Sequence, residues 1–369
     1  MLIKQIQKEY ISDVLKTSDN FDYSYLSQNP YITWDIICAN PDKPWNWYVL
    51  SRHKDITWKI ICNNLNKPWS WLSISCNPNI TIQIIENNPN KPWNWHGISN
   101  NPNIIWDIIQ ENPDKPWNWF YISQNTNITW DIIKDNPDKP WIWDYVSQNI
   151  NITLDIIRDN PDKPWSWYEI SQNKNITVDI ICNSPDKPWD WYQLSFNPNI
   201  TWKVIEDHRD KSWCWYEISC NLNITWDIIC NNPDKPWDWL GISYNPNITI
   251  QIIENNPNKP WNWHGISCNP NITWNIVEKN KDKPWDWYNI SKYSNITWKI
   301  VQDNPDKPWD WRGLSQNPNI FKLPDDVLIK RLKQYFAVKK IYRYWFRCIT
   351  DPAYVICRKR LLDEFMDEV

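Results

Sequence analysis

A 24-residue unit repeats along most of the chain and constrains the fold more than any other feature. The pattern Ile-Thr-Trp-Asp-Ile-Ile-x-x-Asn-Pro-Asp-Lys-Pro-Trp-x-Trp-x-x-Ile-Ser-x-Asn-Pro-Asn recurs twelve times with no insertion or deletion. A period of this length is typical of solenoids, in which each unit packs on its neighbours to bury a continuous core. The first Trp of the paired Trp-x-Trp marks the register and falls at Trp45, Trp69, Trp93, Trp117, Trp141, Trp165, Trp189, Trp213, Trp237, Trp261, Trp285 and Trp309.

The first half of each unit predicts a short helix. Thr33 is a good N-cap, and Asp35 stands in the first turn, where a carboxylate interacts favourably with the helix dipole. Ile32 before the cap and Ile37 at the fourth helical position can form a hydrophobic staple. Pro41 ends the helix, because the residue before a proline avoids the α region.

The second half of each unit predicts another short helix, starting near Asp42. This position holds Asp or Asn in all twelve units, as a side-chain N-cap requires, and Pro44 suits the first turn. Trp45 and Trp47 would point about 200° apart on a helix, so one faces its own unit and the other the next. We therefore expect an all-α solenoid of about twelve two-helix units. Helices of roughly eight residues are marginal alone, so stacking must stabilise them.

A β-solenoid is the alternative architecture. Ile32, Trp34 and Ile36 alternate along the chain, and Trp, Ile, Thr and Tyr are all strand formers. Against strands, the chain has only four Gly residues for tight corners. The adjacent Ile36-Ile37 pair and the caps at both segment starts also fit helices better, so the α-solenoid is preferred.

Three regions follow from where the pattern starts and stops. Residues 1–31 hold an N-terminal cap, predicted as an amphipathic helix, and a half-repeat in which Phe21 and Tyr23 replace the paired Trp residues. Residues 32–319 are the tandem solenoid, and residues 320–369 are a basic helical C-terminal segment. Because solenoid units contact only their neighbours, we expect a single elongated rod with helical caps at both ends.

The C-terminal segment combines an apolar stripe with a high positive charge. The stripe follows helical i, i+3, i+4, i+7 spacing and consists of Ile341, Tyr344, Trp345, Cys348 and Ile349. Residues 330–360 hold ten Lys or Arg and one Asp, a net charge of +9. The stripe either docks on the last repeat as a cap or binds a partner as a basic amphipathic helix. The candidate partner-binding residues are Lys339, Lys340, Ile341, Arg343, Trp345 and Arg347.

Composition and spacing argue against several classes of function. No Gly-rich phosphate loop, zinc-protease motif, Cys/His grouping or nucleophile elbow occurs, so we expect no catalytic residue, metal site or cofactor. Residues 1–319 carry a net charge of −8, and an acidic array is a poor partner for nucleic acid. No signal peptide or membrane span is apparent, so nine Asn-Ile-Thr triplets are interpreted as helix starts rather than glycosylation sites. Seven of the ten Cys fall at two positions of the unit that other units fill with residues such as Gln, Lys or Arg, so we expect reduced thiols.

The position that Tyr48 occupies varies freely from unit to unit, while the residues around it change little. Ser51 and Lys43, in contrast, have an equivalent in every unit, so the Ser is structural and the Lys stem packs on Trp with its charge in water. Variable side chains at fixed lattice points are typical of an extended binding surface. The leading hypothesis is therefore a non-enzymatic, monomeric scaffold that binds another protein. The candidate variable surface positions include Tyr48, Leu72, His96, Phe120, Asp144 and Arg312.

The repeat unit resembles the Trp-rich repeat proteins of giant amoeba-infecting viruses of the Mimivirus type. The tail from Ala337 to Leu361, with its Asp351-Pro352-Ala353-Tyr354 stretch, is similar to theirs as well. The resemblance covers residues 21–361. It implies a viral gene product made in the host cytoplasm, so the expected partner of the scaffold is a host or viral protein, and it implies no particular activity.

Two alternative functions stay open. Leu323-Pro324-Asp325-Asp326-Val327-Leu328 looks like the opening of an F-box, which would imply a substrate adaptor for a host ubiquitin ligase. Ile341-Tyr342 and Phe346-Arg347 are similar to parts of a calmodulin-binding IQ motif, with Tyr342 in place of its defining Gln.

The second alternative function is recognition of glycans or small ligands on exposed Trp side chains, which requires many indoles at the surface.

Overall fold

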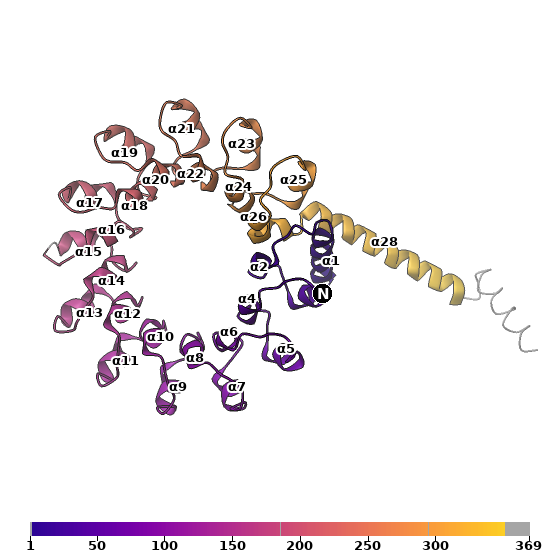
Figure 1. The fold of residues 1–369 in the computed structure, drawn as a ribbon, viewed down its shortest axis with the longest axis horizontal. Helices are drawn as coiled ribbons and strands as arrows, with labels where there is room; N and C mark the ends of the chain where they lie inside the picture. The colour runs from indigo at the N-terminus through magenta and orange to yellow at the C-terminus, as the bar shows by residue number, and fades with distance from the viewer. Residues whose placement is uncertain (1, 185, 294, 351–369) are drawn as a thin grey trace, which may run out of the picture. The chain divides into compact units, whose positions relative to one another are not determined.

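The computed structural model describes residues 2–184, 186–293 and 295–350, and within these ranges short α-helices alternate with turns (Figure 1). The α-solenoid prediction is confirmed, and the β-solenoid alternative is wrong for the described residues. The chain separates into two compact units. Asn20–Ile320 forms the repeat unit, and the described residues before and after it form the terminal unit.

The repeat unit alternates two series of short helices. Figure 1 shows the odd-numbered helices on the outside of this unit and the even-numbered helices on its inside. The outer helices are α3 (Trp34–Ala39), α5 (Trp58–Asn63), α7 (Ile82–Glu86), α9 (Trp106–Glu111), α11 (Trp130–Asp135), α13 (Leu154–Asp159), α15 (Val178–Asn183), α17 (Trp202–Asp207), α19 (Trp226–Asn231), α21 (Ile250–Asn255), α23 (Trp274–Lys279) and α25 (Trp298–Asp303). The inner helices are α2 (Tyr23–Leu26), α4 (Trp47–Ser51), α6 (Trp71–Ser75), α8 (Trp95–Ser99), α10 (Trp119–Gln124), α12 (Trp143–Gln148), α14 (Trp167–Gln172), α16 (Trp191–Leu194), α18 (Trp215–Cys220), α20 (Trp239–Tyr244), α22 (Trp263–Cys268), α24 (Trp287–Tyr293) and α26 (Trp311–Gln316). The short helix α27 (Pro318–Phe321) follows them.

The outer helices begin where the sequence predicts, but the inner helices begin later. Thr33 stands at the N-cap of α3 without a side-chain cap hydrogen bond, whereas Thr57 caps α5 with its side chain, which accepts a hydrogen bond from the backbone N–H of Ile60. The inner helix α4 begins at Trp47, and its N-cap is Asn46 rather than Asp42. The Asp42 prediction is therefore wrong. The reason is that the backbone N–H of Trp45 donates to the carbonyl of Lys43 at 2.8 Å, a tight turn that precedes the helix.

The paired Trp residues join successive units, as their spacing predicts. The Trp47 and Trp69 rings meet edge to face, with centroids 5.0 Å apart. The first Trp of every pair also donates its indole N–H to the carbonyl five residues earlier, as Trp45 does to Asn40 at 2.9 Å. These contacts combine aromatic packing with a satisfied donor, which favours burial of such large rings.

Conserved polar residues of the unit bridge neighbouring repeats. The Ser51 hydroxyl donates to the carbonyl of Trp47 and accepts from the backbone N–H of Ser70 in the next unit. Asn77 is fully buried, and its amide donates to the carbonyls of Ser51 and His53 in the preceding unit and of Ile56 at the start of its own unit. Asn79 likewise donates to the carbonyls of Lys54 and Ile56. The interpretation of the Asn-Ile-Thr triplets is therefore half wrong, because the Thr caps a helix while the Asn joins two units.

The four glycines of the chain occupy one position of the inner helices, at Gly97, Gly241, Gly265 and Gly313. A Cβ atom added at Gly97 would lie 2.5 Å from the backbone oxygen of Leu72 in the neighbouring helix. None of the described glycines has a positive φ. These glycines therefore permit a close approach between adjacent inner helices and do not serve as turn residues.

The repeat unit closes on itself, so the expectation of an elongated rod is wrong. The half-repeat packs on the last inner helix through the same contacts that join all other units. The backbone N–H of Asp22 donates to the Ser315 hydroxyl at 2.9 Å, and the buried Asn29 amide donates to the Ser315 carbonyl at 3.1 Å. Phe21 packs edge to face on Trp311 at 5.1 Å. Thirteen equivalent aromatic contacts thus run around a closed ring.

The terminal unit pairs α1 (Leu2–Lys16) with α28 (Asp325–Thr350). The Gln7 side chain donates to the carbonyl of Phe321 and accepts from the backbone N–H of Leu323. Arg331 forms ion pairs with Asp13 at 2.7 Å and Glu9 at 3.6 Å. The Gln7 amide and the Arg331 guanidinium thus connect α1 with the C-terminal residues of this unit. Most of α28 lies beyond Arg331 and takes no part in these polar contacts.

Candidate functional site

Trp side chains of the repeats serve packing rather than surface recognition. Among the described residues, Trp345 is the only exposed Trp, at 53% exposure, and every repeat Trp is buried or half-buried. The Lys67 ammonium lies 5.8 Å from the ring centroid of Trp47, and equivalent pairs recur around the ring. The invariant Lys therefore packs on Trp, as the sequence analysis predicts. The repeats do not offer the array of exposed indoles that the glycan hypothesis requires.

The variable positions form a row along the inner helices. We define the inner row as positions 46, 48, 49 and 52 and their equivalents in the other units. Tyr48 is 60% exposed, and the other candidate positions are exposed too: Leu72, His96, Phe120, Asp144 and Arg312. Leu50, whose position is aliphatic in every unit, and the invariant Ser51 are fully buried in the same helix. The variable side chains are thus at the surface, while the invariant ones hold the ring.

Neighbouring side chains of the inner row touch across unit boundaries. Phe120 packs on Tyr145 of the next unit with ring centroids 4.0 Å apart, and His96 lies 6.2 Å from Tyr121. The Asn118 amide lies 2.9 Å from the imidazole of His96. Because these contacts cross from one unit to the next, the inner row is one continuous surface rather than a set of isolated patches.

One arc of the inner row combines acidic and aromatic side chains without a basic residue. Between residues 142 and 244 the inner row holds no Lys or Arg. Its acidic members are Asp144, Glu169, Asp190, Glu217 and Asp238, and its exposed tyrosines are Tyr168, Tyr192 and Tyr216. Burial raises the pKa of the Glu169 carboxyl, and the neighbouring Asp144 raises it further. We call residues 142–244 of the inner row the acidic arc. Like-charged carboxylates held this close favour a cationic partner.

A duplicated histidine has two different partners in the inner row. Residues 77–99 and 245–267 are identical, so His96 and His264 occupy matching places. His96 faces the Asn118 amide, whereas the His264 Nδ1 atom lies 2.6 Å from a carboxylate oxygen of Asp286. Burial raises the pKa of Asp286, but hydrogen bonds from His264 and from the Asn289 backbone outweigh burial and hold this pKa below its ordinary value.

The Asp286 carboxylate should make stability depend on pH. Because its pKa is lower in the folded chain, its contribution is complete above the ordinary Asp pKa of about 4 and is lost as the pH falls through the lowered value. We expect Asp286→Asn to destabilise the protein at pH 7 by at most about 1 kcal/mol, and the difference from wild type to vanish near about pH 3. Urea unfolding at both pH values measures this. Asn118→Asp is the matched variant, because it places a carboxylate beside His96. The stability that this carboxylate adds should depend on pH in the same way, and a pH-independent effect in both variants would contradict the assignment.

The cysteines fall into two classes of exposure. Among the nine described cysteines, none is disulfide-bonded. The exposed class lies on outer helices and consists of Cys38, Cys62, Cys182 and Cys230. In the inner row, burial and then the nearby Glu217 raise the pKa of the Cys220 thiol to about 12. Burial also raises the pKa of Cys76 and Cys268.

Alkylation should therefore separate the two classes. The thiolate is the reactive form, so thiols with a raised pKa react slowly. We expect iodoacetamide at pH 8 to modify the four outer-helix cysteines at least about tenfold faster than Cys76, Cys220 and Cys268. Peptide mass spectrometry over a time course measures the rates. Equal rates at Cys62 and Cys220 would contradict the burial of the inner-row thiols.

Helix α28 presents a second surface in the terminal unit. The residues that the sequence analysis singles out are all exposed: Lys339, Lys340, Ile341, Arg343, Trp345 and Arg347. Ile341 is 67% exposed and Tyr344 is 64% exposed, while Cys348 is buried. The Ile349 side chain and residues 351–369 lie outside the described residues. Whether the stripe caps the last repeat or binds a partner therefore stays a prediction.

No group of three His, Cys, Asp or Glu side chains arranged to hold a metal ion is found in the described chain. No helix within the described ranges is long and apolar enough to cross a membrane. Comparisons with protein-family models, with curated proteins and with solved structures gave no match. The functional proposals therefore rest on the inner row of the repeat unit and on the exposed surface of helix α28.

Proposed function

We propose that this protein is a non-enzymatic scaffold that binds a basic polypeptide along the inner row of its ring. The observation that carries the proposal is the acidic arc, in which five carboxylates lie among three exposed tyrosines and no Lys or Arg. Tyr supplies large contact area with little conformational entropy to lose, and carboxylates steer a cationic partner into place. The recurring Ser, Asn and Trp contacts of the ring hold these side chains in register.

The resemblance to giant-virus repeat proteins directs the search for this partner to an amoebal host cell. The purified ring protein is immobilised, and a host cytoplasmic extract is passed over it. We expect a basic protein to be retained at low salt and released at about 0.5 M salt, where charges are screened within a few ångströms. A variant with Asp144→Asn, Glu169→Gln and Glu217→Gln should lose this protein, since it keeps the side-chain sizes but removes three charges.

The control variant changes uncharged residues in another part of the same row. Tyr48→Ser, Leu72→Ser and Phe120→Ser change three exposed inner-row residues outside the acidic arc, and this variant should retain the same protein. Circular dichroism shows that every variant is folded. The proposal is wrong if the three charge-removing substitutions, Asp144→Asn, Glu169→Gln and Glu217→Gln, leave the retained proteins unchanged.

Helix α28 is a separate candidate surface for the same scaffold. Its exposed Ile341 and Trp345 lie among exposed basic residues, which suits an acidic and apolar partner. The ubiquitin-ligase adaptor stays a prediction for this segment, whose residues 325–350 form one uninterrupted helix. Ile341→Asp with Trp345→Asp tests both ideas, because loss of a retained acidic protein or of ligase binding would identify which partner α28 recruits.

A further inference from the structure

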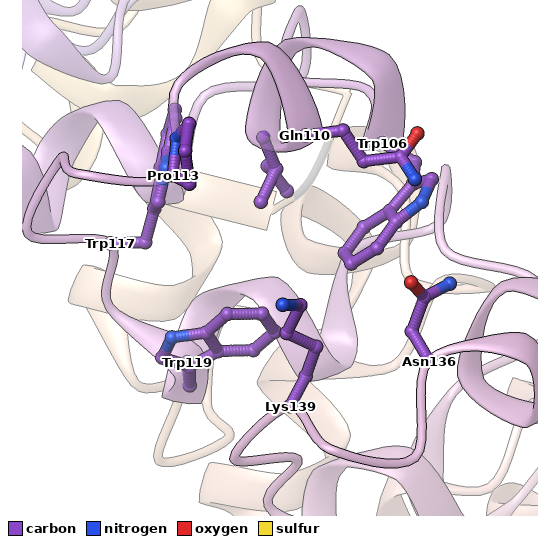
Figure 2. Close-up of a pocket in the computed structure, with 8 residues that line it drawn as sticks. Trp106, Gln110, Pro113, Trp117, Trp119, Asn136 and Lys139 are labelled. Atoms are coloured by element: carbon purple, nitrogen blue, oxygen red, sulfur yellow. The ribbon is translucent and has the colours of Figure 1, made fainter.

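A pocket recurs at the junction between consecutive repeats. In the fourth full unit, Trp106 of α9 and Trp117 lie on opposite sides of it, with Trp119 and Lys139 along a third side (Figure 2). The same eight repeat positions line a pocket at Ile82 of α7 and another at Ile250 of α21. At these eight positions the three pockets differ only in two ways: Ile82 or Ile250 replaces Trp106, and a Glu replaces Gln110.

The exchange of Trp for Ile enlarges the pocket. Its volume is about 270 Å³ where Trp106 lines it, about 500 Å³ at Ile82 and about 550 Å³ at Ile250. The larger volumes fall in the range of small-molecule sites, and the smaller one does not. Eight of the twelve full units hold a Trp at this position. The other units of the ring thus show which group the enlarged pockets can accommodate, namely an indole.

We propose that the pockets at Ile82 and Ile250 each bind an indole-sized planar aromatic group, the Trp side chain of a partner polypeptide. Trp95 forms an aromatic wall of the first pocket and is itself fixed edge to face on Trp117 at 5.0 Å. The Lys115 ammonium lies 5.8 Å from the Trp95 ring centroid and lines the pocket as well. An aromatic ring inserted here contacts a ring edge or face, an aliphatic Ile and a Lys stem, which together favour a flat, apolar ligand.

The two sites are copies of one another on opposite sides of the ring. Ile82 and Ile250 lie within the identical stretches 77–99 and 245–267, an Asn and a Lys of the following unit complete each lining, and Figure 1 shows α7 and α21 across the ring from each other. Ile82 and Ile250 therefore stand in the same local environment twice. This site does not depend on the acidic arc, so failure of the proposed function would leave it untouched.

A fluorine NMR titration with 5-fluoroindole tests the sites. Ile82→Trp and Ile250→Trp fill the pockets with the residue that eight sister units use, so both variants are expected to fold. We expect each substitution to lower the number of bound 5-fluoroindole equivalents by one, and the double variant to lower it by two. Trp106→Ile should add one equivalent, because it enlarges a third pocket. The readout is the change between variants, so binding elsewhere on the ring cancels.

The partner side chain is tested by competition. N-acetyl-tryptophanamide, which mimics a Trp within a polypeptide, should displace 5-fluoroindole from the wild-type protein and from Trp106→Ile. No saturable binding to the wild type, or equal binding to the wild type and to the double variant, would overturn the site. Failure of N-acetyl-tryptophanamide to compete would overturn its assignment to a polypeptide side chain.

Discussion

Substitution at the ring closure should open the repeat unit as well as destabilise it. Phe21→Ala removes a buried ring that packs on Trp298 at 5.8 Å and on Trp311 at 5.1 Å, and we expect it to cost about 3–5 kcal/mol. Combining it with Asn29→Ala leaves the Ser315 carbonyl without its amide partner, at a further cost of about 1–3 kcal/mol. Urea unfolding measures the loss, and small-angle scattering should show a larger radius of gyration for the double variant.

The control for this experiment is Tyr48→Ala, which removes a ring of similar size from an exposed inner-row position. It should change the unfolding midpoint and the radius of gyration little, since surface substitutions usually shift stability by about 0.5 kcal/mol or less. If the double variant at Phe21 and Asn29 behaves like this control, the two ends of the repeat unit are not joined. An open rod would lose only local order at one end from the same substitutions.

Loss of a single indole from the ladder, the series of aromatic contacts between successive units, should destabilise the ring by a similar amount. Trp141 is buried, meets Trp119 edge to face at 5.1 Å and packs on Trp106 at 5.6 Å. Its indole N–H donates to the Asn136 carbonyl at 2.8 Å. We expect Trp141→Ala to lower the free energy of unfolding by about 3–5 kcal/mol, because it leaves a cavity at a unit boundary. Calorimetry or urea unfolding gives this value directly.

Two further variants separate the causes. Trp141→Phe copies the Phe21 position of the half-repeat, so it keeps aromatic packing and removes the N–H donor. It should lower the free energy of unfolding by more than the loss of a single hydrogen bond, which contributes about 1 kcal/mol, but clearly by less than Trp141→Ala does. Trp345→Ala removes the exposed indole of α28 and should have almost no effect on unfolding. A comparable loss at Trp141 and Trp345 would show that the ladder does not carry the stability of the ring.

The sequence predicted the repeat unit well because local chemistry decides its parts. Thr57 caps its helix since its side chain reaches the Ile60 N–H, and the 24-residue period fixes which Trp meets which. The prediction for Asp42 failed because an Asp ahead of a proline looks like a cap. The turn at Trp45, closed by a backbone hydrogen bond to Lys43, moves the helix start to Trp47. Such a turn has no distinct signature in the residue pattern.

The candidate surfaces were only partly visible in the sequence. The variation at Tyr48 and its equivalents indicated an exposed row, and the structure adds that Phe120 and Tyr145 make it continuous across units. The pockets at Ile82 and Ile250 were missed, although the exchange of Trp for Ile at one repeat position was the signal. Its meaning required the volumes of the pockets, which depend on side chains from two neighbouring units.

By itself, the sequence determined the unit, its helices and the aromatic and polar contacts between neighbours, because all of these act over a single period. Only the tertiary structure decided that the array closes. The small rotation from each unit to the next is set by side-chain packing, and it accumulates over the whole array before Asp22 and Asn29 meet Ser315. A slightly different rotation would leave the same repeats as an open solenoid, and no residue pattern encodes that sum.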